Sequence, residues 1–112
     1  MFVLYYFCSC MCVYVCSAPH SVAAKESSCG CAGIFSGPAA VELYAEAFDS
    51  VGALDKLEGF VSVFGQRYYG LDPHPHRITL RREDWTAPST FHFGDAEVRP
   101  LRAGEIVRWK IV

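Results

Sequence analysis

The sequence predicts an α+β fold for this chain of 112 residues, with a helical block followed by a block of short strands. Apolar residues recur three and four positions apart over residues 38–64, which is helical spacing. Polar and apolar residues alternate in several short segments after residue 76, which is strand spacing. Helices and strands in separate blocks are typical of α+β proteins. The length suits one small domain, or a piece of a larger one, with a single core.

Composition excludes two classes of protein. Hydrophobic residues make up 52% of the chain and charged residues 20%, so a disordered or low-complexity chain is excluded. Ten Lys and Arg residues stand against twelve Asp and Glu residues, a formal charge of −2. Without a basic excess, binding to a nucleic-acid backbone is not expected.

Residues 1–15 carry no charge, and two interpretations of this N-terminal segment stay open. It is too short for a transmembrane helix, which needs about 20 residues. We favour a buried strand at about residues 11–15, rich in Val and Tyr. The alternative is a signal peptide that ends near Ala18, although the positive start of such peptides is missing. Residues 1–11 remain unassigned.

The six cysteines all fall within the first 31 residues, whereas a disulfide framework would spread them over the fold. A soft-metal site or lipidation is an alternative role for some of them, but we expect small apolar fillers. A zinc site is conceivable on paper, but Cys-x-Cys is tighter than the usual ligand spacing. The same spacing argues against a redox pair. The soft-metal site or lipidation would involve Cys8, Cys10, Cys12 and Cys16. The conceivable zinc site would consist of Cys29, Cys31, His74 and His76.

A long loop over residues 16–37 precedes the first predicted helix. Pro38 suits the first helical position, with Ser36 or Gly37 as the cap, and Gly52 ends the helix. Its acidic residues lie off the apolar stripe. The stripe consists of Val41, Tyr44, Ala45, Phe48 and Val51, and the acidic residues are Glu42, Glu46 and Asp49.

A second helix is predicted from about Ala53 to Phe64, where Gly65 stops it, and a very short turn joins the two helices into a hairpin. Its apolar residues recur at helical spacing and are expected to be buried. They are Leu54, Leu57, Phe60, Val61 and Phe64.

Short strands follow a proline-broken loop at residues 71–76. Alternation predicts a strand at 77–81, one or two strands at 91–101 around Gly94, and a final strand at 105–112. In the final strand, Val107 and Trp109 share a face with Ile111. The charged run at residues 81–84 is expected to be a solvated patch.

Several strings along the chain resemble dihydroorotase, a family of the amidohydrolase superfamily, in its shorter single-function form. They are Ser17-Ala18-Pro19-His20, KESSCGCAG at 25–33, VELYAEAF at 41–48, ALDKLE at 53–58, YGL at 69–71, ITL at 78–80, AGE at 103–105 and Arg108-Trp109. The resemblance covers about residues 15–112. KESSCGCAG is long and compositionally unusual, so chance agreement is not expected.

The resemblance implies a (β/α)₈ barrel, but a complete barrel needs about 200 residues or more. Residues 12–112 would therefore be the C-terminal part of a dihydroorotase-like domain. That part would hold the last barrel strand, the active-site loop after it, the closing helices and the short C-terminal strands. Loops at the C-terminal ends of barrel strands form active sites, which fits a long loop directly after an apolar strand.

The resemblance also implies the chemistry, which is the reversible closure of N-carbamoyl-L-aspartate to dihydroorotate in pyrimidine biosynthesis, with zinc as the metal. His20 and Ala32 match the positions that hold the substrate carboxylate. Cys16 stands where the family has the Asp that binds a metal and moves the proton. The other metal ligands have no counterpart here, so we expect no zinc on this chain alone and no activity in isolation.

The partners implied are the small-molecule substrate and a second copy in a homodimer, with no nucleic acid and no membrane, in the cytoplasm. Two alternatives stay open. One is a non-catalytic interaction module that reuses this segment, and the other is a small secreted Cys-rich protein.

Overall fold

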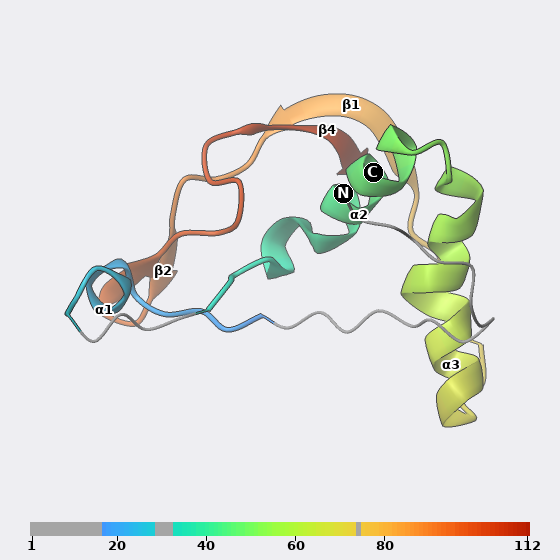
Figure 1. Cartoon of the computed structure of the whole chain (residues 1–112), viewed down its shortest axis with the longest axis horizontal. Helices are drawn as coiled ribbons and strands as arrows, with labels where there is room; N and C mark the ends of the chain where they lie inside the picture. The colour runs from blue at the N-terminus through green and yellow to red at the C-terminus, as the bar shows by residue number, and fades with distance from the viewer. Residues whose placement is uncertain (1–16, 29–32, 74) are drawn as a thin grey trace.

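The computed structural model describes residues 17–28, 33–73 and 75–112 (Figure 1), and it mixes helix and strand as predicted. The predicted strand at 11–15 lies outside the described residues. The helices are α1 (Val22–Lys25), α2 (Ala40–Ser50) and α3 (Phe64–Tyr69), with 3₁₀ turns at Gly37–Ala39 and Leu54–Lys56 and a π-helical stretch at Gly59–Val63. The strands are β1 (Leu80–Thr86), β2 (Phe91–Phe93), β3 (Ala96–Val98) and β4 (Ile106–Ile111).

Two separate antiparallel pairs make up the described strands. β1 pairs with β4, with Leu80 opposite Ile111 and an irregularity between Arg82 and Trp85. β2 pairs with β3 through a two-residue turn in which Gly94 has φ +60°, a left-handed conformation that glycine adopts without strain. The predicted strand pair around Gly94 and the predicted final strand are therefore confirmed.

The first helix begins and ends close to the predicted positions. Ser36 precedes the 3₁₀ turn that leads into α2, but its side chain makes no capping hydrogen bond. Gly52 takes φ +68°, and its N–H donates to the Asp49 carbonyl at 3.0 Å. This glycine ends the helix in the predicted manner because a side chain there would be strained.

The predicted stop of the second helix at Gly65 is wrong. Helical structure continues through Gly65 to Tyr69, and Gly70 ends it with φ +64°. The N–H of Leu71 donates to the Gln66 carbonyl at 2.9 Å, which completes a Schellman-type cap. Gly65 stays helical because an interior glycine costs only about 1 kcal/mol, whereas Gly70 stands directly before the proline-broken loop.

The predicted strand at 77–81 is placed too early. The strand that forms is Leu80–Thr86, because its pairing with β4 decides its position. The charged run at its centre is only partly a solvated patch, since Lys110 on β4 donates to Glu83 at 2.7 Å. This hydrogen bond, together with one from Arg81, lowers the pKa of the Glu83 carboxyl.

The acidic face of α2 packs against the strands. Glu42 is buried at 7% exposure and Ala45 is fully buried, while Val51, predicted in the apolar stripe, is 62% exposed. The apolar side of α2 instead meets the second helix, where the Phe60 ring lies 5.3 Å from Tyr44 and 5.2 Å from Phe48. Glu46 and Asp49 face β4, where the Arg108 N–H and the Trp109 indole N–H donate to them.

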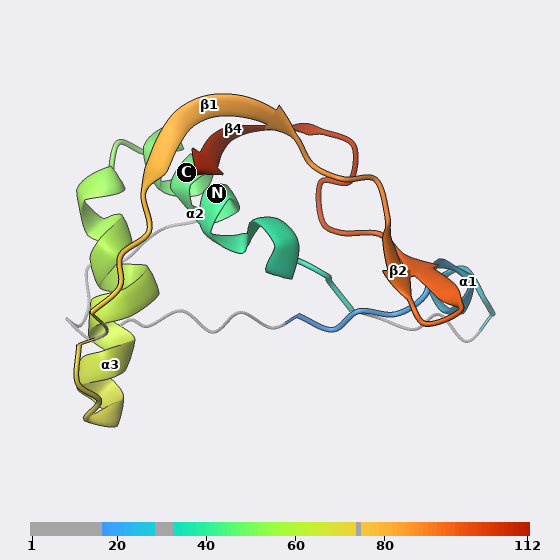
Figure 2. The same cartoon turned by 180° about the vertical axis from the view of Figure 1, so that it is seen from behind.

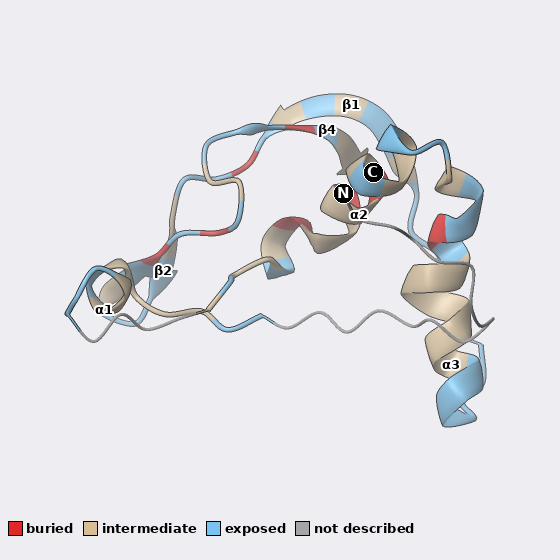
Figure 3. Cartoon of the chain, viewed as in Figure 1, coloured by how far each residue is buried: buried red, intermediate tan, exposed pale blue. Residues whose placement is uncertain are grey.

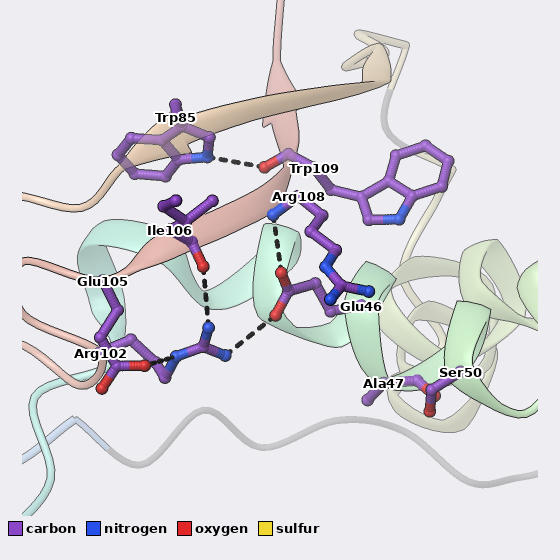
Figure 4. Close-up of polar contacts among 9 residues, drawn as sticks. All are labelled: Glu46, Ala47, Ser50, Trp85, Arg102, Glu105, Ile106, Arg108 and Trp109. Atoms are coloured by element: carbon purple, nitrogen blue, oxygen red, sulfur yellow. Dashed lines mark hydrogen bonds and ion pairs between the residues drawn. The ribbon is translucent and has the colours of Figure 1, made fainter.

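Glu46 links α2 to β4 and to the turn before it (Figure 4). One carboxylate oxygen accepts the backbone N–H of Arg108 at 2.7 Å, and the other accepts from the Arg102 guanidinium at 3.1 Å. Arg102 also donates to Glu105 and to the Ile106 carbonyl, the latter at 2.8 Å. The hydrogen bond to Glu105 and the nearby carboxylate charges raise the pKa of Arg102.

The apolar core is small for a chain of this length (Figure 3). Among the described residues, Val107 is the largest side chain that is fully buried. Of the second helix's predicted stripe, Leu57 is buried and the other members are half-buried. Several large apolar side chains of the described residues are exposed instead, among them Ile34, Tyr69 and Ile106. Apolar surface is therefore left uncovered on the part of the chain that the structure describes.

We predict that Glu46→Ala lowers the free energy of unfolding by about 1–3 kcal/mol, because the Arg108 N–H and the Arg102 guanidinium lose their acceptor. Urea denaturation of the full chain measures this. The matched control is Glu58→Ala, whose ion pair with Arg77 is exposed and is expected to contribute about 0–1 kcal/mol. Equal losses for the two variants would contradict the link assigned to Glu46.

We also predict that the folded chain binds the dye 1-anilinonaphthalene-8-sulfonate, because large apolar side chains are exposed on its surface. Tyr68 is 66% exposed, Leu71 62% and Ile78 59%. Fluorescence titration measures the dye uptake, and small-angle scattering measures the radius of gyration. A chain that takes up no dye and has the compact radius of about 13 Å would contradict this prediction.

Candidate functional site

Residues 17–34 close on themselves to form a loop with a narrow base, which we call the neck and which consists of Ala18, His20, Gly33 and Ile34. The N–H of Ala18 donates to the Ile34 carbonyl at 2.9 Å. This hydrogen bond joins the two ends of a segment that is long and rich in small residues. His20, the predicted binding residue, lies two positions after the Ala18 end of this hydrogen bond.

Gly33 lies so close to the facing chain that no side chain fits there. A Cβ atom at this position would lie 2.4 Å from the Ala18 carbonyl oxygen and 3.0 Å from Cδ2 of His20. The first distance is an impossible contact with backbone, so glycine is required by the close approach. The edge of the His20 ring therefore lies against the Gly33 backbone.

The loop contains a short helix, α1, that the sequence prediction of an irregular segment missed. The Ser21 hydroxyl caps it by accepting the N–H of Ala24 at 3.2 Å, and the Ser27 hydroxyl donates to the Ala24 carbonyl at 2.8 Å. The available signal was a serine directly before the helix-compatible run VAAK. His20 precedes this cap, so α1 starts immediately after the candidate binding residue.

Lys25, the last residue of α1, ties the helix to the neck. Its Nζ donates to the Gly33 carbonyl at 2.6 Å in a partly buried position. In the sequence, Lys25 is simply the first residue of the string KESSCGCAG. Nothing in the residue pattern indicated that its ammonium group would bond to backbone eight positions later.

The C-terminal strands support the base of the loop. Phe35 makes an edge-to-face contact with Phe91 of β2 at 5.8 Å between ring centres, and its carbonyl accepts the N–H of Leu101 at 2.8 Å. Figures 1 and 2 both show α1 beside the β2–β3 pair, and α1 contacts β3. The strands predicted after residue 90 therefore carry the candidate site.

Several residues singled out in the sequence lie outside the described residues, so their placement stays a prediction. Ala32 is the chain neighbour of Gly33, and His20 is half-buried beside that glycine. Within residues 17–28, 33–73 and 75–112, no three His, Cys, Asp or Glu side chains gather in a way that could hold a metal ion. The residues outside the described ranges are Cys8, Cys10, Cys12, Cys16, Cys29, Cys31, Ala32 and His74.

An apolar groove of about 570 Å³ lies between the second helix and residues 73–80. Leu54, Leu57 and Val61 line it from the helix, and Ile78 and Leu80 from the other side. His76, predicted to be solvent-exposed, is exposed at its rim. The neck residues do not line this groove, so the two features are separate.

At the neck, His20 places an imidazole ring beside the Gly33 backbone. An imidazole N–H and a neighbouring backbone N–H are donors of the kind that bind a carboxylate.

No helix in the described part of the chain is both long and apolar enough to cross a membrane.

Dihydroorotases are among the curated proteins and solved structures that are similar to this chain. No protein-family profile matches the chain. Dihydroorotases from Pseudomonas fluorescens and Pseudomonas aeruginosa are each 59% identical over 96 residues, which is 86% of this chain and 28% of each relative.

Two solved structures are similar in fold. Dihydroorotase from Saccharomyces cerevisiae in complex with 5-fluoroorotic acid has a TM-score of 0.80 at 30% identity, over 86% of this chain and 28% of that one. Dihydroorotase from Campylobacter jejuni has a TM-score of 0.70, also at 30% identity and with the same coverage. The chain thus spans little more than a quarter of its relatives' length, and over that span it is a dihydroorotase-family sequence.

Proposed function

We propose that residues 12–112 are the C-terminal part of a dihydroorotase-type amidohydrolase and that the neck holds the substrate's carboxylate. The observation that carries this proposal is the approach of His20 to Gly33, the residue that follows Ala32. In this proposal an imidazole N–H of His20 and the backbone N–H of Ala32 bind the same carboxylate. The family reaction interconverts N-carbamoyl-L-aspartate and dihydroorotate, and both molecules contain the carboxylate that ring closure leaves unchanged.

The similar yeast structure supports the choice of ligand class, because its bound molecule is named as an acid. Two polar donors on a loop that rigid strands support are suited to binding and orienting a small anion. The complete enzyme would act in pyrimidine biosynthesis in the cytoplasm, with homodimer formation as a further expectation.

The proposal also assigns the uncovered apolar surface a purpose. In a (β/α)₈ barrel, helices pack on the outside of the strands, and the loops after the strands build the active site. Exposed large apolar side chains such as Tyr68, Leu71 and Ile78 are what a part of such a domain would show. We expect the barrel strands to cover this surface and to bring the neck to the reaction centre.

The described residues do not fit a zinc centre. Where the structure describes the chain, it provides no group of three metal-ligating side chains, and we therefore derive no catalytic step through a metal from it. In the complete enzyme the zinc ligands would come from elsewhere, with position 16 as the family position that this chain carries.

Position 16 decides whether such an enzyme turns over. The family resemblance places a proton-transferring Asp there, and this chain has Cys16. A thiolate binds zinc well, but a metal-bound thiolate is a poor base. We therefore propose that the chain, even when completed, is severely impaired in proton transfer.

The test is a hybrid in which this chain from residue 16 onward replaces the matching segment of the Pseudomonas fluorescens relative. We predict that Cys16→Asp raises kcat by about 10² to 10⁴, the usual contribution of a positioned acid–base group. His20→Ala in that restored hybrid should raise KM more than it lowers kcat, because a carboxylate contact is made in ground and transition states alike.

Steady-state kinetics with dihydroorotate distinguishes the outcomes. Equal turnover of the Cys16 and Cys16→Asp hybrids would refute the proton-transfer role of position 16. A folded Cys16→Asp hybrid without activity would refute the proposed function and favour the non-catalytic interaction module.

The full chain by itself is predicted to hold no stoichiometric zinc, because one family ligand position, Cys16, cannot make a site with its usual three or four protein ligands. Metal analysis after gel filtration in zinc-containing buffer measures this. Two zinc ions per chain would contradict it.

A further inference from the structure

We propose that Lys25 is a positioning residue for the ligand held at the neck, an inference that rests on the proposed function. Its ammonium group, by holding the Gly33 carbonyl, sets the separation between His20 and the backbone that follows Ala32. The separation between His20 and the Gly33 backbone would therefore depend on a lysine that need not touch the ligand.

The hydrogen bond from Lys25 is short and connects two sides of the loop. Nζ lies 2.6 Å from the Gly33 carbonyl oxygen, in a partly buried position. Charge-assisted hydrogen bonds of this kind are stronger than neutral ones. A contact that joins the end of α1 to residue 33 is thus a strong constraint on the loop.

Helix α1 makes this constraint act on His20. The histidine directly precedes the cap residue Ser21, and Lys25 is the last residue of the helix. The N–H of Lys25 donates to the Ser21 carbonyl at 3.1 Å, which closes the helical turn. The helix is therefore a short spacer, with His20 at one end and the bond to Gly33 at the other.

The other side of the neck is constrained as well. The Ile34 carbonyl accepts from the Ala18 N–H at 2.9 Å, so two successive carbonyls are held from two different parts of the loop. The Gly33 backbone lies so close to Ala18 that a side chain at position 33 would clash with the Ala18 carbonyl. The Lys25 ammonium group adds a second restraint on residue 33, through its carbonyl oxygen.

Kinetics on the Cys16→Asp hybrid tests the consequence for the ligand. Lys25→Met keeps the length of the side chain but removes the donor, and should raise KM about tenfold, the factor for loss of one charge-assisted hydrogen bond. The kcat value should change less than twofold. Lys25→Arg retains a cationic donor and should recover part of the loss. Lys56→Met, in a 3₁₀ turn outside the loop and in an ion pair with Asp55, is the matched control and should leave KM unchanged.

Nuclear magnetic resonance on the full 112-residue chain tests the geometry without any activity. A cross-peak between Hδ2 of His20 and the Hα atoms of Gly33 is expected in the unchanged chain and in Lys56→Met, and should weaken in Lys25→Met. Overall unfolding by urea serves to show that the variants remain folded.

The outcomes separate this inference from the proposed function. An inactive Cys16→Asp hybrid overturns the proposed function, and this inference with it. An active hybrid whose KM is unchanged by Lys25→Met overturns this inference alone, as does a cross-peak that persists at full strength in that variant. A raised KM together with a weakened cross-peak supports it.

Discussion

The Glu46 carboxylate holds together parts of the chain that lie 56 and 62 residues apart. It links α2 to β4 and to Arg102, at the end of the segment that follows Thr86. That segment contains Phe91 and Leu101, which contact Phe35 at the base of the loop. A continuous set of contacts therefore connects the Glu46 link to Phe35, next to the neck. A small apolar core would not supply this rigidity alone, and the directional bonds to one carboxylate replace part of it.

Local signals predicted the elements whose ends are set by local chemistry. Pro38, Gly52 and Gly94 each require or favour one backbone conformation, and the structure has a helix start, a helix end and a strand turn at these positions. Predictions failed where distant partners decide. Gly65 was predicted to end the second helix, but it lies within the helix, and Gly70 is the residue that ends it. The strand near Leu80 takes its limits from β4, and the acidic face of α2 is interior because donors on distant strands satisfy it.

The candidate site was predictable in part, and only through family resemblance. A lone His20 in a loop has no assigned role from residue type alone, and the approach of its ring to Gly33 is a tertiary fact. The serine cap of α1 was a usable local signal. The bond from Lys25 to Gly33 had no such signal, since a lysine in a polar loop is ordinarily solvated. The described part of the loop is thus held by contacts to backbone that small residues make possible.

The central claim is that this chain is one part of a dihydroorotase-type domain whose other part covers its exposed apolar face. The direct measurement is mixing the full chain with the separately purified remainder of the Pseudomonas fluorescens relative, followed by sedimentation analysis. A complex with one copy of each part, with loss of the dye binding that the free chain shows, is the expected result. Two species that sediment independently, with dye binding unchanged, would contradict the claim.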